Sequence, residues 1–155
     1  MKKAIWFDMD GTLNKFYDVR GWLEMLTNED VTPYLVAPAK VDTEKLAIVL
    51  NSLSEAGFEI GIISWRAKYE SKEYAKAVRE AKIEWLKKEI PFTFDKIHIV
   101  KYGTAKHTVP AKDFRNGILV DDNEEVRNKW EKYGGITINA EKENWLENLE
   151  KILDN

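Results

Sequence analysis

The sequence has no cysteine, only two histidines and no long apolar run. Without cysteine, disulfides, thiolate metal sites and cysteine nucleophiles are excluded, and His98 and His107 alone argue against a multi-histidine metal site. A membrane span needs about 20 apolar residues, and no segment approaches that length. The pair Lys2-Lys3 is followed by only a few apolar residues before Asp8, which is unlike a signal peptide. We therefore expect a cytoplasmic protein with no membrane contact.

An excess of positive charge is also missing, because the formal net charge at pH 7 is -3. The chain therefore has no electrostatic basis for binding duplex nucleic acid. Its 155 residues suit a single domain that spans residues 1–155 and buries a core of its own. We expect a monomer or a weak homodimer.

The stretch from Ala4 to Leu13 is the one around which the rest of the chain is organised. Four apolar residues, 4–7, predict a strand that is buried on both faces, and Asp8, Asp10 and Gly11 follow directly. Near a strand end the i, i+2 relation points both carboxylates the same way, where they repel. A bound divalent cation would relieve this repulsion. The alternative is a solvated turn, since Asp-Gly is common in turns.

Beyond residue 41, short apolar stretches alternate with amphipathic ones. The apolar stretches predict further strands at residues 58–63, 97–100, 117–120 and 136–138. Helices are predicted between them, with Asp42, Ser71 and Asn123 as N-caps, and a last helix follows the final strand. This alternation predicts an open, mainly parallel five-stranded α/β sheet, Rossmann-like, with helices on both faces.

One of these helices carries Lys82, Lys87 and Lys88 among the glutamates Glu84 and Glu89. Interleaved charges of both signs are typical of a solvated helix face. We therefore expect these lysines to be exposed.

Residues 14–41, called the insert below, separate the first strand from its helix. The insert is rich in aromatic residues and is too long for an ordinary connection in a compact domain. We expect a small cap or lid that borders a binding site. The alternative is that its aromatic side chains form a local satellite core.

Polar residues follow three of the predicted strands, where ligands bind in open parallel sheets. Asp8 and Asp10 follow the first strand, Ser64 the second, and Asp121 with Asp122 the fourth. If the first and fourth strands are neighbours, four carboxylates converge, and Mg²⁺ is the cation that suits them. A carboxylate beside a phosphate ester can act as the nucleophile, and its neighbour can move the proton. Phosphoryl oxygens also need a hydroxyl, here that of Ser64, and an ammonium.

Two lysines precede the fourth predicted strand, and either Lys101 or Lys106 can supply that ammonium. The spacing alone leaves this choice open.

These residues resemble the motifs of the haloacid dehalogenase (HAD) superfamily. The first motif, Asp-x-Asp-Gly-Thr/Val after an apolar strand, is matched by residues 8–12. The second, a Ser or Thr that ends the next core strand, is matched by Ser64, and the acidic pair of the fourth by Asp121 and Asp122. The third is a lone lysine, for which Lys106 is the better match. The sequence also bears some likeness to 5'-nucleotidases and deoxyribonucleotidases.

The resemblance implies a Mg²⁺-dependent phosphatase that works through an aspartyl-phosphate on Asp8. Asp10 would be the general acid/base and would contact the metal through its backbone carbonyl, which leaves its side chain free. Asp122 would complete the metal ligands, with Asp121 as a further ligand or behind it. The oxygens of the phosphoryl group would be held by Ser64 and Lys106.

The resemblance also places the insert at a position where members of the superfamily carry caps that select the substrate. Its aromatic side chains could stack on a base, so that a small phosphorylated substrate, in particular a nucleotide, is expected. Thr12, Trp65 and Arg66 are the predicted substrate-binding residues, the last two at the mouth of the site. Alternatives are a phosphate- or nucleotide-binding regulator with little turnover, a phosphatase for nucleic-acid ends and, less suited to the Asp-x-Asp-Gly-Thr turn, a phosphorylation-receiver domain.

Overall fold

A computed structural model describes residues 2–154, and its centre is a five-stranded parallel sheet in the order β3-β2-β1-β4-β5. The strands are β1 (Ala4–Phe7), β2 (Glu59–Trp65), β3 (Lys96–Val100), β4 (Ile118–Asp121) and β5 (Ile136–Asn139). The α-helices are α1 (Trp22–Thr27), α2 (Thr32–Val36), α3 (Thr43–Glu55), α4 (Lys72–Glu89), α5 (Glu124–Lys132) and α6 (Trp145–Glu150). Short 3₁₀ turns are η1 (Phe16–Asp18), η2 (Lys106–Thr108), η3 (Lys112–Phe114) and η4 (Lys151–Asp154). The predicted α/β class and parallel sheet are confirmed.

The central strand β1 is fully buried and pairs in parallel with β2 on one side and β4 on the other. The first and fourth strands are therefore neighbours, which was the condition for their carboxylates to meet. The carboxyl ends of parallel strands lie along one edge of a sheet, so the residues that follow β1, β2 and β4 share that edge.

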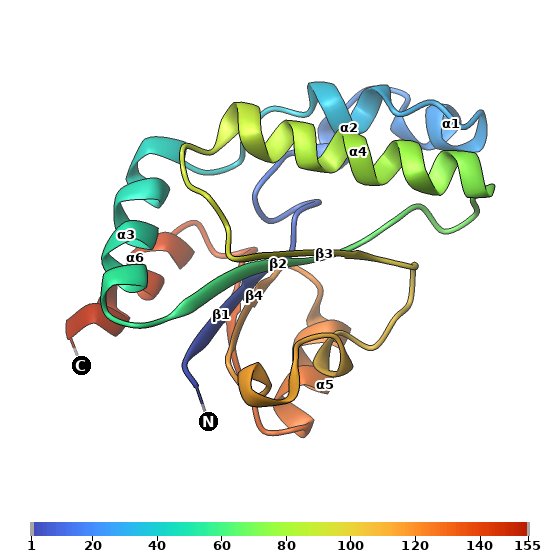
Figure 1. Ribbon diagram of the computed structural model, residues 1–155. Helices are drawn as coiled ribbons and strands as arrows, with labels where there is room; N and C mark the ends of the chain where they lie inside the picture. The colour runs from blue at the N-terminus through green and yellow to red at the C-terminus, as the bar shows by residue number, and fades with distance from the viewer. Residues whose placement is uncertain (1, 155) are drawn as a thin grey trace.

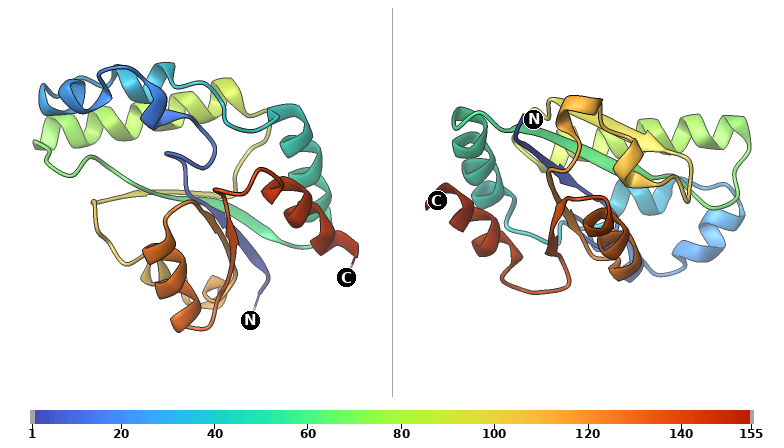
Figure 2. Two further views of the ribbon diagram at one scale, coloured as in Figure 1. Left: turned by 180° about the vertical axis from the view of Figure 1, so that it is seen from behind. Right: turned by 90° about the horizontal axis from the view of Figure 1, so that it is seen from below.

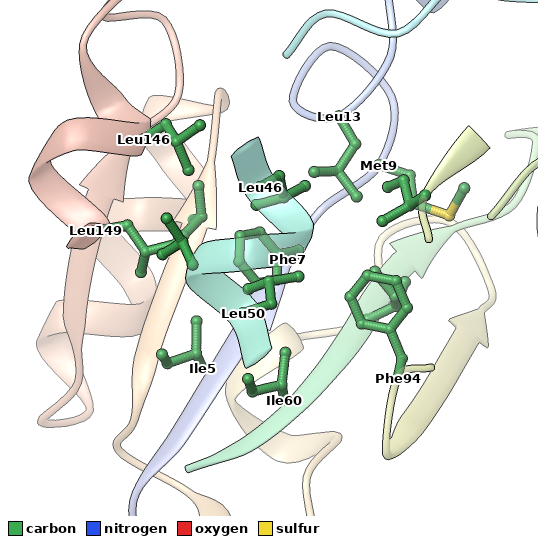
Figure 3. Close-up of a cluster of buried hydrophobic side chains, with 14 of the residues drawn as sticks. Ile5, Phe7, Met9, Leu13, Leu46, Leu50, Ile60, Phe94, Leu146 and Leu149 are labelled. Carbon is green, nitrogen blue, oxygen red and sulfur yellow. The ribbon is translucent and has the colours of Figure 1, made fainter. Parts of the chain in front are cut away.

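Alternate residues of β1 supply two separate cores on the two faces of the sheet. Ile5 and Phe7 face the larger core, which α3 and α6 cover with side chains such as Leu50 and Leu149 (Figure 3). On the other face, Trp6 packs with side chains of α5 and of the segment before β4. Figure 2 shows α3 and α6 together and α5 apart from them. The predicted helices on both faces are thus present.

Helix α4 belongs to two environments along its length. Its carboxyl-terminal half contributes Trp85 and Leu86 to the larger core, whereas Tyr74 and Val78 of its first half pack against the insert. In Figure 1, α1 and α2 lie along this first half. Tyr74 also donates a 2.9 Å hydrogen bond from its hydroxyl to the backbone carbonyl of Asp30.

The insert forms the satellite core considered from sequence and also leaves aromatic side chains exposed. Phe16 and Tyr34 stack with centroids 4.7 Å apart and are buried in a satellite core with α4. Tyr17 is 53% exposed, and Trp22 is only partly buried. The insert therefore has an inner apolar side fixed to α4 and an outer aromatic side.

Across residues 2–154, every helix is too short or too polar to cross a membrane.

Candidate active site

The turn after β1 places two carboxylates at the edge of the sheet. Asp8 extends the strand by one residue, since its backbone N–H donates to the carbonyl of Val120 at 3.0 Å. The chain then turns through Gly11 at φ +84°, and a Cβ there would collide with the Asp122 carboxylate. A glycine is thus required for both its backbone conformation and its missing side chain.

Lys106 lies between carboxylates from two strands. Its Nζ donates to Asp8 Oδ1 at 3.0 Å and to Asp121 Oδ2 at 2.8 Å. The lysine stands in η2, in the connection from β3 to β4, and is 5% exposed. Lys101, the other lysine considered from sequence, is exposed. Of the two lysines, Lys106 is the one that contacts the nucleophile candidate Asp8.

A third carboxylate, that of Asp122, completes the cluster. Oxygens of Asp8, Asp121 and Asp122 all lie within 4.8 Å of one another. Thr12 is fully buried, and its hydroxyl lies 3.0 Å from Asp8 Oδ2 and 3.3 Å from Asp122 Oδ1. The structure thus places Thr12, one of the predicted substrate-binding residues, against the carboxylates in a fully buried position.

The electrostatics of this cluster show a shortage of positive charge. Burial disfavours the ionised form of Asp8, but the charge of Lys106, hydrogen bonds with Asp122 and Lys106, and the charge of Lys82 together hold the pKa of Asp8 below its ordinary value. Burial and the charge of Asp8 raise the pKa of Asp121 to about 6 and that of Asp122 to about 8. One ammonium therefore does not compensate three carboxylates.

The donor set fits a hard divalent cation. Carboxylate oxygens are the ligands that Mg²⁺ prefers, and the unfavourable ionisation of Asp121 and Asp122 is what a cation at this point would relieve. Both oxygens of Asp121 already accept hydrogen bonds, from Lys106 and from the backbone N–H of Asn123 at 2.9 Å. Asp122 accepts fewer hydrogen bonds than Asp121, so it is the stronger candidate of the pair for a direct ligand.

Asp10 was predicted to converge with the other three carboxylates, but it is not part of their cluster and pairs with the buried Lys82 instead. The Nζ of Lys82 donates to Asp10 Oδ2 at 2.8 Å, to Ser64 Oγ at 2.7 Å and to the carbonyl of Trp65 at 2.8 Å. Lys82 is 1% exposed, so the prediction that it lies on a solvated helix face was wrong. It follows Val78 by four residues and precedes Trp85 by three, which puts it on the apolar stripe of α4.

That spacing was visible in the sequence. A lysine at a core position of an amphipathic helix needs a buried partner. The glutamates between the lysines favoured an exposed, charged face instead, although the helical spacing places Lys82 among the apolar residues. The side chain of Asp10, which the resemblance left free, is hydrogen-bonded to Lys82 and, at 3.3 Å, to Asn14.

A cavity of about 310 Å³ opens above the carboxylates. Asp8, Asp10, Asp121 and Asp122 line it, and so do the predicted mouth residues Trp65 and Arg66. The Nε of Arg66 pairs with Glu70 at 3.0 Å, and its Nη1 donates to the carbonyl of Ile99 at 3.0 Å. Ser64 is 1% exposed, at the end of β2.

Neither a protein-family model nor a curated protein matches the sequence. Solved structures do resemble the fold. A predicted HAD-like family hydrolase from Porphyromonas gingivalis aligns over 100% of this chain and 99% of its own, with a TM-score of 0.61 and 14% identity. The fold is that of the HAD-like hydrolases.

Two further solved structures align over most of the chain. A D,D-heptose 1,7-bisphosphate phosphatase from Burkholderia thailandensis covers 86% of this chain and 75% of its own, at TM-score 0.52 and 13% identity. A HAD family enzyme from Bacteroides thetaiotaomicron, in complex with magnesium and inorganic phosphate, covers 90% and 94%, at TM-score 0.53 and 12% identity. The resemblance to the HAD superfamily is thus confirmed for the fold.

Proposed function

We propose that the protein is a Mg²⁺-dependent phosphomonoester hydrolase in which Asp8 is the nucleophile. The observation that carries the proposal is the placement of Asp8, buried at the tip of the central strand, with Lys106 bonded to it and Asp122 within reach of a shared cation. Two of the similar folds point the same way, since one is a phosphatase and one holds magnesium and phosphate.

The chain's own residues account for both halves of the reaction. Asp8 Oδ1 accepts a hydrogen bond from Lys106, Oδ2 accepts one from Thr12, and the carboxylate also contacts Asp122. Two carboxylate oxygens carry four lone pairs, so a lone pair remains for bond formation. One oxygen attacks phosphorus, the P–O bond to the alcohol breaks, and Asp10 protonates the leaving oxygen. In the second half, Asp10 takes a proton from water as the water oxygen attacks the aspartyl-phosphate, which releases inorganic phosphate and restores the Asp8 carboxylate.

Charge on the transferring group needs compensation as well. Lys106 supplies an ammonium at Asp8 and Ser64 supplies a hydroxyl at the end of β2. Mg²⁺ held by Asp8, Asp122 and the backbone carbonyl of Asp10 would supply further positive charge next to the phosphoryl oxygens.

Two substitutions test these roles. Asp8→Asn is expected to lower phosphate release from p-nitrophenyl phosphate to background, because an amide cannot form the aspartyl-phosphate. Asp10→Asn is expected to lower turnover by about 10²–10⁴-fold, the usual contribution of a general acid/base. Asp113→Asn, an exposed aspartate in η3, is the matched control. Wild-type activity in the Asp8 variant, or activity unchanged by EDTA, contradicts the proposal.

The lining of the cavity supports a nucleotide as the substrate. Tyr17 and Trp22 line it from the insert, Trp65 lines it from the end of β2, and Tyr102 lines it from the segment after β3. Aromatic rings bind bases by stacking, which contributes about 1–3 kcal/mol per base. The insert is thus proposed to be the part of the domain that recognises the leaving group.

A panel of 5'- and 3'-mononucleotides and simple alkyl phosphates tests this specificity. Tyr17→Ala is expected to raise KM for the preferred mononucleotide by about 5–100-fold, as the loss of one stacked ring predicts, with little effect on glycerol phosphate. Tyr69→Ala, at 80% exposure and outside the cavity lining, is the control. Equal activity on nucleotides and alkyl phosphates removes the nucleotide proposal. Tight nucleotide binding with no Mg²⁺-dependent phosphate release would instead favour a binding protein.

A further inference from the structure

Lys82 is the most unusual charged residue of the described chain that the reaction above does not use. It is 1% exposed and lies where the two environments of α4 meet, with Val78 packed against the insert on one side and Trp85 in the larger core on the other. Burying an ammonium is costly unless it is paired and hydrogen-bonded. Its position therefore has to be explained by what it contacts.

All three acceptors of Lys82 belong to the end of β2 or to the turn after β1. They are Asp10 Oδ2, Ser64 Oγ and the Trp65 carbonyl, at 2.7–2.8 Å. Asp10 and Ser64 are also the residues given the proton-transfer and phosphoryl-binding roles. One buried side chain from a third element thus holds both.

The chemistry of an ammonium fixes what Ser64 can do. Because a lysine ammonium only donates, the Ser64 oxygen must accept from it. The hydroxyl proton of Ser64 is then directed away from Lys82 and is left to donate to another group. A phosphoryl oxygen is the acceptor that this site would provide.

The same contact fixes the orientation of Asp10. One carboxylate oxygen accepts from Lys82, and the other accepts from the Asn14 side chain at 3.3 Å. A carboxylate held at both oxygens has little freedom to rotate. Such placement matters because general acid/base catalysis requires hydrogen-bond reach to the reacting oxygen.

We propose that Lys82 is a positioning residue that holds Asp10 and Ser64 in their working orientations. This inference rests on the proposed phosphatase function. Lys82 also connects the site to the insert, since its Nζ lies 5.0 Å from the centroid of the Tyr34 ring in α2. The ring shields the ammonium from the side of the insert.

Lys82→Met tests the proposal, because it keeps the volume and removes the donors. A misplaced Asp10 delays protonation of the leaving oxygen, which an alkyl phosphate needs far more than p-nitrophenyl phosphate. We expect kcat/KM to fall about 10²-fold or more for the alkyl ester, in keeping with the usual contribution of a general acid. For the aryl ester, the factor by which kcat/KM falls should be smaller by about 10-fold or more. A purely structural effect of the substitution would lower kcat/KM for both esters by the same factor.

Lys87→Met, the same substitution at an exposed position of α4, is the matched control and should leave both rates unchanged. The Asp10→Asn background provides a second check. In that background, adding Lys82→Met should change the ratio of kcat/KM for the aryl ester to kcat/KM for the alkyl ester by less than about 3-fold. The reason is that Lys82 acts through Asp10, and the effects of two coupled residues are not additive. If circular dichroism shows that the methionine variant is unfolded, Lys82→Gln, which keeps an N–H donor, is expected to shift the ratio in the same direction by a smaller factor.

The outcomes separate the two proposals. Absence of phosphate release by the wild type on every ester overturns the phosphatase function itself. An active wild type with equal losses for both esters in Lys82→Met overturns only the role of Lys82. The role of Lys82 is supported if Lys82→Met lowers kcat/KM selectively for the alkyl ester and if this selectivity disappears in the Asp10→Asn background.

Discussion

Replacing Asp122 by asparagine should make the metal-free protein more stable while removing its response to Mg²⁺. The three carboxylates have oxygens within 4.8 Å of one another, and at an effective dielectric constant of about 20 two such charges repel by about 3 kcal/mol. Solvent reaches Asp122 in part, which reduces the gain from its neutralisation to about 2 kcal/mol. The Thr12 hydroxyl has one proton and lies closer to Asp8, at 3.0 Å, than to Asp122, at 3.3 Å, so the substitution leaves the hydrogen bond from Thr12 to Asp8 in place.

The gain in stability from Asp122→Asn depends on pH, and the pKa shift of Asp122 determines the direction of this dependence. The pKa of Asp122 is raised from 3.8 to about 8 in the folded protein. Between about pH 4 and pH 8 the folded state thus binds a proton that the unfolded state has lost, so stability falls as pH rises through this window. Asp122→Asn removes that fall. The stability difference between variant and wild type should grow from pH 5 to pH 8 and level off above it.

Thermal unfolding in EDTA from pH 5 to pH 9 measures this difference. For a chain of this length, about 2 kcal/mol corresponds to a melting temperature roughly 4–8 °C higher for the variant at pH 8.5. The difference between curves cancels the titration of His98 and His107, which both proteins share. Added Mg²⁺ should raise the melting temperature of the wild type, more at pH 8.5 than at pH 6, and should leave that of Asp122→Asn unchanged.

Asp113→Asn serves again as the control, since it removes one negative charge outside the cluster. If Asp122→Asn melts below the wild type in EDTA at pH 8.5, the carboxylates do not destabilise one another and the electrostatic argument fails. A normal Mg²⁺ response in this variant would refute the assignment of Asp122 as a ligand.

Further substitutions probe the turn and the core. Gly11→Ala and Gly57→Ala both place a side chain at positive φ and should each lose about 1–2 kcal/mol in thermal unfolding. Only Gly11→Ala should also lose the Mg²⁺ response, because its Cβ meets Asp122 whereas Gly57 has open space; equal Mg²⁺ responses would contradict this. Leu50→Ala should cost about 2–5 kcal/mol in urea unfolding, since Leu50 is fully buried, and a cost below about 1 kcal/mol would argue against the described core.

The sheet could be predicted because its signals are local. Residues 4–7 are too few for a helix and lead straight into Asp8, so both the strand and its end are marked in the sequence. Helix α3 has Asp42 at its N-cap and Gly57 just beyond its end, and the structure shows the cap accepting from the Lys45 N–H at 3.1 Å. Strand neighbours, by contrast, depend on the whole fold, and the pairing of β1 with β4 entered only as a condition.

The insert was harder to predict, because its partner is distant in the sequence. Its inner side chains Phe16 and Tyr34 are covered by α4, and the contact between Ser71 and Glu29 ties its far end to the start of that helix. Composition shows that the segment is aromatic but not which rings face inward. Which aromatic rings form the satellite core and which line the cavity therefore depends on the tertiary fold.

The buried position of Lys82, which was not predicted, shows how α4 joins these parts. Its first half packs against the insert through Tyr74, and its second half packs into the larger core through Trp85. The indole N–H of Trp85 also donates to the carbonyl of Ala37, in the insert, at 2.7 Å. Lys82 stands between these contacts and reaches Asp10. A shift of the insert along α4 would therefore disturb the Tyr34 ring and, through Lys82, the proposed proton-transfer residue Asp10. On this argument, exchanging the insert for one of another shape should alter turnover as well as substrate choice, whereas exchanging only its exposed rings Tyr17 and Trp22 should alter substrate choice alone.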